Sequence, residues 1–535
     1  MKIKNEITPR KLIIISSIFL VFFGNIAFFK NILVIYPANL ENILFLLSLV
    51  ILFVCVNIFL FSLICFKQTI KPVLITVLLM SSLAAYFMDS YNVIIDDVMI
   101  DNIIKTDINE SLDLLSFKQL LYFILLGVLP SVLVYKAKIT SLATKKAIIS
   151  HLILLAGSLL LAVIIILSLS NFYASFFREH KSLRFYANPS YYLYSSIKYV
   201  NHFFKNNNSV LSTIGLDAFI PPSDEHRELI IFVVGETARA DHFSLNGYSK
   251  KTNPYLEKQD VISFDNVSAC GTSTAHSVPC MFSIYNRTSF SKGKAQSTEN
   301  ALDILQRAGV NVIWLDNNSD SKGVADRIPY QNFKLAENNP ICDSECRDEG
   351  MLTNLQTYID DHPKGDIFIV LHQMGNHGPA YYKRYPKRFE KFTPTCQTNQ
   401  LEQCSEEEIS NTYDNALVYT DYFLSKTIQL LKNNNKNFES ALFYVSDHGE
   451  SLGENNLYLH GLPYLIAPDA QTHVPMVMWF SDSFDAQDIN LAKLKTQIHK
   501  KLSHDNLFHT ILGLMEIKSS VYNESLDIIE HEEYE

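Results

Sequence analysis

The chain reads Leu229-Ile-Ile-Phe-Val-Val-Gly-Glu236 where a run of β-branched and aromatic residues ends in a glycine and a carboxylate. Similar short runs recur further along the chain and alternate with longer helix-like stretches. This alternation is typical of an α/β domain that is built around a mostly parallel sheet. We therefore predict a strand at each run, namely Leu229–Val234, Val310–Leu315, Ile367–Leu371, Ala441–Val445 and Val474–Phe480.

Polar residues follow four of these five runs. In parallel α/β sheets, ligands bind beyond the carboxyl ends of the strands, so residues that are far apart in the sequence can meet there. We expect these residues to form one site that binds metal or phosphate. They are Gly235-Glu236, Asp316-Asn317-Asn318, His372 through His377, and Ser446-Asp447-His448.

Two carboxylates and an imidazole stand out among these polar residues: Glu236, Asp447 and His448. A mixed set of oxygen and nitrogen ligands suits Zn²⁺, and Mn²⁺ is also possible. Each residue alone could belong to an ordinary turn at the end of a strand. It is the combination of all three that predicts a metal site.

A nucleophile is expected in the stretch Cys270-Gly-Thr-Ser-Thr-Ala-His-Ser-Val-Pro-Cys280. A glycine and several hydroxyls precede a predicted helix start, where free N–H groups favour phosphate. A threonine hydroxyl beside zinc has a lowered pKa and becomes a usable nucleophile. The same hydroxyls could instead cap the helix, and these residues alone do not distinguish Thr272, Ser273 and Thr274.

The composition excludes some classes of protein. Of the 535 residues, 48% are hydrophobic and 19% are charged, and the net charge is −10, which argues against a disordered or nucleic-acid-coating protein. Residues 1–170 carry a small excess of Lys and Arg, whereas the remainder is strongly acidic. We therefore expect a membrane domain in 1–170, an aromatic-rich interfacial connector in 171–223 and a catalytic domain in 224–535.

The first part contains apolar runs close to the length of about 20 residues that crosses a bilayer. Only helices would satisfy the backbone polar groups of such segments. A signal peptide is the alternative for the first run, but a small-residue cleavage site is lacking and further runs follow. The five predicted spans are Leu12–Phe29, Ile43–Phe66, Pro72–Met88, Leu120–Tyr135 and Ala147–Leu169.

The positions of Lys and Arg predict how these spans are oriented, because cytoplasmic flanks hold the positive excess. Basic residues precede the first span and lie between spans two and three and between spans four and five. The loop 89–119 is acidic and is expected outside the cytoplasm. Five spans then place the part of the chain after about residue 171 on the outer face of the membrane.

Six cysteines lie in the exported part, and their even number fits an oxidising compartment. We expect three disulfides that each close a short loop. A zinc site is the alternative for one pair, but no second close pair accompanies it. The expected pairs are Cys270 with Cys280, Cys342 with Cys346, and Cys396 with Cys404.

Several motifs of the chain occur together in one known family. They are Gly235-Glu-Thr-Ala-Arg-Ala-Asp-His242, Asn246-Gly-Tyr248, Asn253-Pro-Tyr255, Cys270-Gly-Thr-Ser-Thr-Ala-His-Ser-Val-Pro-Cys-Met-Phe-Ser283, Asn376-His-Gly-Pro379 and Ser446-Asp-His-Gly-Glu450. On these motifs the chain resembles the lipid A phosphoethanolamine transferases, which include the transferable colistin-resistance enzymes. The resemblance implies a multi-pass protein of the bacterial inner membrane, with five transmembrane helices followed by a sulfatase-like catalytic domain of the alkaline phosphatase superfamily in the periplasm.

The resemblance also implies roles for particular residues. Zinc would be held by Glu236, Thr274, Asp447 and His448, with Thr274 as the nucleophile. His377 and His460 would bind a second zinc or the phosphate group, and Asn318 and Lys322 would contact the substrate. The lipid substrate would be held by Asn102, Thr106 and Glu110, which recur every four residues as on one face of a helix, although a solvated helix face would look the same.

The implied reaction is a zinc-dependent, two-step transfer of phosphoethanolamine. Thr274 would take the group from phosphatidylethanolamine, and a phosphate oxygen of lipid A would then displace it, which would confer resistance to polymyxins and other cationic peptides. The partners would be two lipids within a membrane, with no nucleic acid, and we expect a monomer. The alternatives are a related superfamily enzyme with a core-sugar acceptor, glycerol-phosphate transfer or lipid phosphodiesterase activity, and a catalytically silent envelope scaffold.

Overall fold

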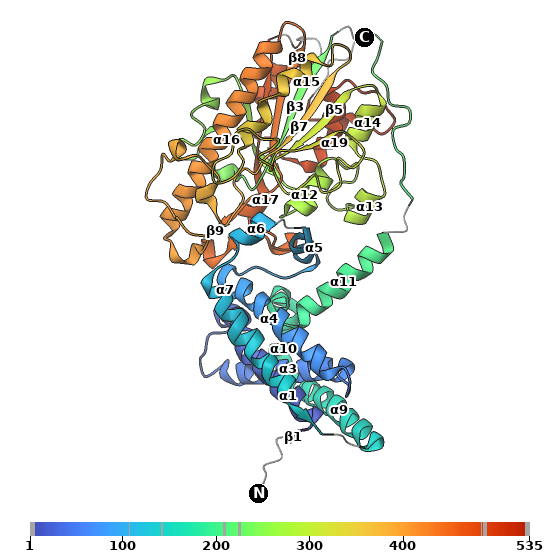
Figure 1. The fold of residues 1–535 in the computed structure, drawn as a ribbon, viewed down its shortest axis with the longest axis vertical. Coiled ribbons are helices and arrows are strands. Elements are labelled where there is room, and N and C mark those ends of the chain that lie inside the picture. Colours follow the sequence, from blue (N-terminus) through green and yellow to red (C-terminus); the bar gives the residue numbers. More distant parts are fainter. Residues whose placement is uncertain are drawn as a thin grey trace. The chain divides into compact units, whose positions relative to one another are not determined.

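The computed structural model describes residues 6–105, 108–140, 143–206, 210–222, 226–482, 484 and 489–529 (Figure 1). The chain forms two compact units. One comprises residues 1–100 and 115–200, and the other comprises residues 101–114 and 201–535. The chain therefore leaves the first unit at residue 101, returns to it at residue 115 and leaves it again after residue 200.

The first unit is helical, and four of its helical stretches are long and apolar enough to cross a membrane. They are α3 (Ile43–Ile64), α4 (Ile70–Tyr91), the continuous stretch Phe117–Lys136 and residues Lys145–Ser168 of α9 (Thr144–Ser168). The third stretch consists of α7 (Phe117–Tyr122), a π-helical turn (Phe123–Val128) and α8 (Leu129–Lys136). After α9 follow α10 (Ser170–Glu179) and α11 (Ser190–Asn206).

The first predicted span, Leu12–Phe29, falls on two helices in the structure. The structure has α1 (Pro9–Phe23) and α2 (Ile26–Ile35), which are bent by 58° relative to each other and count as a fifth span only together. The buried Asn25 side chain explains the break. Its Nδ2 donates to the carbonyl oxygen of Leu20 at 2.8 Å and to that of Asn188 at 2.6 Å, so it uses a carbonyl of the last turn of α1.

The second unit is built on an eight-stranded sheet with the order β12-β4-β11-β8-β3-β7-β5-β6. Among these strands β11 runs antiparallel to both of its neighbours, and the other pairs are parallel. All five predicted runs are strands, which confirms the α/β prediction, whereas β4, β6 and β12 were not predicted. The bounds are β3 (Glu228–Gly235), β4 (Ile262–Ser268), β5 (Asn311–Asp316), β6 (Tyr330–Asn332), β7 (Ile367–His372), β8 (Glu439–Ser446), β11 (His473–Phe480) and β12 (Leu502–Ser503).

The sheet is buried on both faces, as the continuous apolar runs require. Alternate residues of β3 enter two separate hydrophobic clusters, with Ile230 and Phe232 in one and Leu229 and Ile231 in the other. The first cluster includes α12 (Thr274–Met281), α14 (Ala301–Arg307) and α19 (Leu507–Leu514). The second includes α15 (Leu355–Asp360) and α16 (Glu406–Asn434), and Figure 1 shows α16 on the opposite side of the sheet from α14 and α19.

The parallel strands end at one edge of the sheet. Gly235 of β3 lies beside Ser446 of β8, and His372 of β7 lies between Val234 and Asp316 of its two neighbours. The polar residues that follow these strands therefore start from adjacent positions. Three disulfides hold loops of this unit, and they join the cysteines that the short loops predicted: Cys270 with Cys280, Cys342 with Cys346, and Cys396 with Cys404.

Candidate metal and nucleophile site

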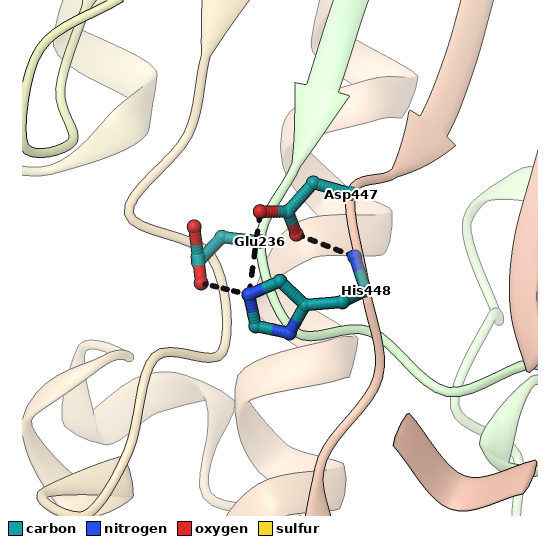
Figure 2. A group of neighbouring side chains, drawn as sticks. All are labelled: Glu236, Asp447 and His448. Atoms are coloured by element: carbon teal, nitrogen blue, oxygen red, sulfur yellow. Dashed lines mark hydrogen bonds and ion pairs between the residues drawn. The ribbon is translucent and has the colours of Figure 1, made fainter. Parts of the chain in front are cut away.

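Glu236, Asp447 and His448 meet at the carboxyl ends of β3 and β8 (Figure 2). One ligand atom from each lies within 4.8 Å of the others, and all three residues are buried. Nε2 of His448 is 3.4 Å from Oε1 of Glu236 and 3.4 Å from Oδ2 of Asp447. The tertiary structure thus joins residues that are more than two hundred positions apart in the sequence.

The hydrogen bonds around His448 leave one ring nitrogen as an acceptor. Nδ1 lies 2.9 Å from the carbonyl oxygen of Gly449, and because a carbonyl can only accept, Nδ1 carries the proton and Nε2 keeps its lone pair. This is the arrangement usual for a metal-binding histidine. Burial lowers the pKa of His448 well below its ordinary value, which also favours the neutral ring.

Asp447 presents a carboxylate oxygen with no protein donor. Its Oδ1 accepts the N–H groups of His448 at 2.7 Å and Thr237 at 3.3 Å, whereas Oδ2 is buried and has no hydrogen-bond partner among the described residues. Burial raises the pKa of Asp447 to about 6. A buried carboxylate oxygen that accepts no hydrogen bond and faces an imidazole lone pair destabilises the fold unless a cation lies between the two groups. The geometry therefore fits a divalent metal ion.

Thr274 is the first residue of α12 and brings a hydroxyl to this group. Its Oγ1 is 3.1 Å and 3.3 Å from the two carboxylate oxygens of Glu236 and 3.4 Å from Nε2 of His448. Thr272 instead donates its hydroxyl to the carbonyl oxygen of Leu462 at 2.6 Å. Of the two threonine hydroxyls, therefore, the one at Thr274 contacts the metal-binding group.

The backbone beside Glu236 is held in an unusual conformation. Thr237 has a φ of 53°, which a β-branched residue rarely adopts. The hydroxyl of Tyr413 donates to the Thr237 carbonyl at 2.7 Å and accepts the N–H of Arg239 at 2.9 Å, and thereby keeps this turn in place. Sequence reasoning missed Tyr413, because a tyrosine within the long helix α16 carries no local signal of such a role.

Gly375 approaches Glu236 from the loop after β7. It has a φ of 50°, and a Cβ built on it would lie 2.9 Å from the carbonyl oxygen of Glu236. A side chain at this position would therefore be strained and would also press on a metal-ligand residue. The glycine permits the loop that carries His377 to approach the backbone of Glu236 closely.

Asn318 and Lys322 occupy the loop after β5. Asn318 Nδ2 donates to Oε2 of Glu236 at 2.8 Å and to the carbonyl oxygen of Gln373 at 2.6 Å, so it orients the Glu236 carboxylate. Lys322 Nζ contacts the carbonyl oxygen and the hydroxyl of Ser319. Lys322 also lines a cavity of about 430 Å³ together with Lys292.

His460 lies close to both His448 and His377. The ring centres of His377 and His460 are 5.6 Å apart, and those of His448 and His460 are 4.4 Å apart. Nδ1 of His377 is buried with no hydrogen-bond partner among the described residues, and burial lowers the pKa of His377 well below its ordinary value. Nδ1 of His460 lies 3.2 Å from Oε2 of Glu450, a buried residue to which the sequence analysis gave no role.

The three predicted lipid contacts are described only in part. Asn102 lies in α5 (Asp97–Lys105). Thr106 lies outside the described residues, and so does the side chain of Glu110, whose backbone belongs to α6 (Ile108–Asp113). That the three share one helix face stays a prediction.

Comparison with known proteins covers both units of the chain. Residues 228–517 match the family described as Sulfatase, and residues 53–204 match the family described as Phosphoethanolamine transferase EptA/EptB. The phosphatidylethanolamine transferase Mcr-2 of Escherichia coli is 42% identical over 524 residues, which is 96% of each chain. The phosphoethanolamine transferase EptA of Escherichia coli K12 is 42% identical over 519 residues, which is 95% of this chain and 94% of that protein.

A solved structure resembles the whole chain as well. The integral membrane protein lipooligosaccharide phosphoethanolamine transferase A from Neisseria meningitidis superposes with a TM-score of 0.94 at 37% sequence identity. The match covers 97% of this chain and 98% of that one. Both the helical unit and the α/β unit are thus shared with one solved protein.

Proposed function

The chain belongs to the family of phosphoethanolamine transferases that act on lipid A, and from this premise we propose that it moves phosphoethanolamine from phosphatidylethanolamine to a phosphate of lipid A. The observation that carries the proposal is the position of Thr274, whose hydroxyl contacts Glu236 and His448 in the middle of a buried metal-binding group. A nucleophile in that position suits covalent phosphoryl transfer.

Glu236, Asp447 and His448 would hold a zinc ion together with the Thr274 oxygen. When bound, zinc supplies a Lewis acid that lowers the pKa of a neighbouring hydroxyl and stabilises charge on phosphate oxygens. Asn318 orients Glu236 by its hydrogen bond at 2.8 Å, and the bond from Nδ1 of His448 to Gly449 keeps Nε2 directed at the site. Zinc suits this mixed set of oxygen and nitrogen donors.

In the first step the Thr274 oxygen attacks phosphorus, the bond from phosphorus to the diacylglycerol oxygen breaks, and diacylglycerol leaves with a proton. In the second step a phosphate oxygen of lipid A attacks the same phosphorus and releases Thr274. His377 and His460 are placed to move these protons or to hold the phosphate group or a second zinc ion. Lys322 and Asn318 would contact the substrate, and Asn102, Thr106 and Glu110 would hold a lipid.

The location of the reaction follows from the charge pattern. Basic residues gather before the first span and in the loops 67–71 and 136–146, which predicts that these segments lie in the cytoplasm. The α/β unit would then lie in the periplasm and act on lipids of the inner membrane as a monomer. The transferred group adds an amine to an anionic lipid, so the product would bind polymyxins and other cationic peptides more weakly.

The test is donor cleavage by detergent-purified, zinc-loaded protein given headgroup-labelled phosphatidylethanolamine. Wild type should release diacylglycerol and retain label, whereas Thr274→Ala should do neither. Thr288→Ala is a matched control, because Thr288 is exposed and bonds only locally to Asn286. If the wild type releases no diacylglycerol even with lipid A present, the donor assignment is wrong, and a related superfamily reaction becomes the better explanation.

A further inference from the structure

Arg384 is a buried cation that joins three separate parts of the second unit. It follows the short helix Tyr381–Lys383, and its side chain is 2% exposed. Its Nε donates to the carbonyl oxygen of His377 at 2.6 Å. One terminal nitrogen pairs with Glu345 and the other pairs with Asp113 at 3.2 Å. Each nitrogen of the guanidinium thus holds a different segment.

Asp113 belongs to the inter-span segment, which we define as residues 101–114. In the sequence this segment lies between the spans formed by α4 and by α7 with α8, yet it belongs to the second unit. Besides Arg384, the Asp113 carboxylate pairs with Lys383, and the Asn399 side chain donates to the Asp113 carbonyl oxygen. At the other end of the segment Asp101 pairs with Lys292. Both ends are therefore held by charges of the α/β unit.

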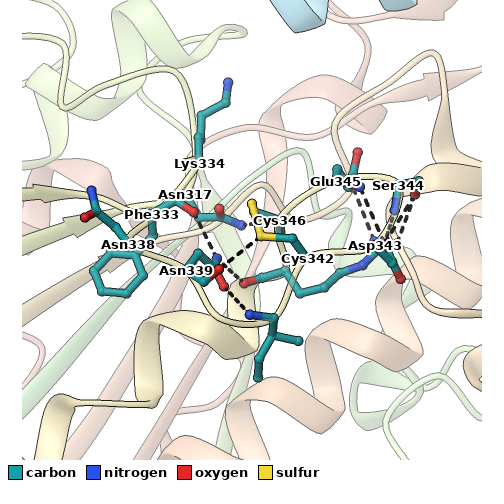
Figure 3. Close-up of a disulfide and its surroundings, with 12 residues drawn as sticks. Asn317, Phe333, Lys334, Asn338, Asn339, Cys342, Asp343, Ser344, Glu345 and Cys346 are labelled. Carbon is teal, nitrogen blue, oxygen red and sulfur yellow. Dashed lines mark hydrogen bonds and ion pairs between the residues drawn. A yellow bond between two sulfur atoms is a disulfide. The ribbon is translucent and has the colours of Figure 1, made fainter. Parts of the chain in front are cut away.

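Glu345 belongs to the loop that the Cys342–Cys346 disulfide closes (Figure 3). Arg347 donates to Glu345 at 3.4 Å, so the Glu345 carboxylate lies between two buried guanidinium groups. The carbonyl oxygen of Cys346 accepts a hydrogen bond from Asn317 at 3.1 Å, and Asn317 precedes the Asn318 that orients Glu236. This loop also borders a cavity of about 400 Å³ that Asp113 and Arg384 line.

We propose that Arg384 is a positioning residue for the lipid substrate, and this inference rests on the proposed transferase function. Arg384 joins the inter-span segment, which carries Asn102, to the backbone of His377. A lipid that is held by the segment and a phosphate group near His377 thereby keep fixed positions relative to each other. A lysine could not replace Arg384, because only the planar fork of a guanidinium directs donors at three acceptors at once.

The test compares variants of the full-length, zinc-loaded enzyme in transfer to lipid A. Asp113→Asn removes the negative charge that faces Arg384 but leaves the hydrogen bond from Arg384 to the His377 carbonyl, so we expect KM for lipid A to rise roughly tenfold with little change in kcat. Arg384→Lys loses the bond to His377 as well, so kcat should also fall, by roughly ten- to a hundredfold. The double variant should lose less than the product of the two single losses, because both variants break the contact between Asp113 and Arg384.

Two further variants separate positioning from a merely structural role. Asp113→Glu keeps the negative charge, so its KM for lipid A should stay close to the wild-type value. Lys387→Gln is a matched control, because Lys387 lies near Arg384 in the sequence, is 83% exposed and pairs only with Glu390 nearby. Thermal stability and zinc content, measured for each variant, should stay at wild-type values for Asp113→Asn.

The inference is overturned if Asp113→Asn leaves KM unchanged, or if the losses of the two single variants multiply in the double variant. Its failure is distinguishable from failure of the proposed function. An active wild type with unaffected variants would refute only the role of Arg384, whereas a wild type that releases no diacylglycerol would refute the function itself.

Discussion

At the scale of single residues, Gly375 shows how closely the loop after β7 approaches a metal ligand. We expect Gly375→Ala to lower zinc occupancy and activity, because the new Cβ would lie 2.9 Å from the Glu236 carbonyl oxygen at a φ of 50°. The strain should also cost about 1–3 kcal/mol of stability. Gly247→Ala is the matched control, because Gly247 has a φ of 95° but nothing lies within 4 Å of its Cβ position. Equal loss of zinc in the two variants, measured by elemental analysis, would show that backbone strain alone is responsible.

Asp447 makes zinc affinity depend on pH. Its carboxyl has a pKa raised to about 6 by burial, and it must lose its proton before it can bind a metal ion. Above that pKa the carboxylate is already ionised, and below it zinc must displace a proton. We therefore expect zinc affinity to weaken as pH falls through about 6, by up to tenfold per pH unit. Competition with a chelator at pH 5 to 8 measures this, and an affinity that is constant between pH 5 and 7 would contradict it.

At the scale of elements, the break between α1 and α2 depends on one buried amide. Asn25 donates to the carbonyl oxygens of Leu20 and Asn188 and accepts the N–H of Asn188 at 2.9 Å. The Leu20 carbonyl still accepts the N–H of Gly24, but Asn25→Ala removes the bonds to the buried N–H and carbonyl of Asn188, so it should cost about 1–3 kcal/mol of stability. Thermal unfolding in detergent would detect the loss. Asn39→Ala, in an exposed turn, is the control and should change little, and an equal effect of both variants would contradict the assignment.

Elements also differ in how well their sequence predicts them. The runs that became β3, β5, β7, β8 and β11 are apolar on both faces, so composition alone identifies them. β4 has a partly exposed pattern, and β12 has two residues, so neither carries a comparable signal. The bend within the first span was not predicted, because hydrophobicity is continuous across Gly24, whereas Asn25 at the bend bonds to Asn188, which is far away in the sequence.

At the scale of the whole molecule, the orientation in the membrane can be tested with reporter fusions. A bacterial alkaline phosphatase reporter, which is active only outside the cytoplasm, should be active when fused after residue 206 and inactive when fused after residue 138. The reason is that Lys136 and Lys138 belong to a predicted cytoplasmic flank, and one more span follows them. The opposite pattern would place the α/β unit in the cytoplasm and would exclude the proposed periplasmic reaction.

The sequence by itself determined the two-part organisation, the parallel sheet and the candidate ligands Glu236, Asp447 and His448, because hydrophobic patterns and residue types after strands are local properties. The hydroxyl-rich stretch alone left the nucleophile open, and the family resemblance implied Thr274. The tertiary structure brings the Thr274 hydroxyl against Glu236, whereas the Thr272 hydroxyl bonds to the carbonyl oxygen of Leu462. No pattern in the sequence predicted a role for Arg384. Its partner Asp113 lies 271 positions away, and no local pattern records where a folded chain brings such residues together.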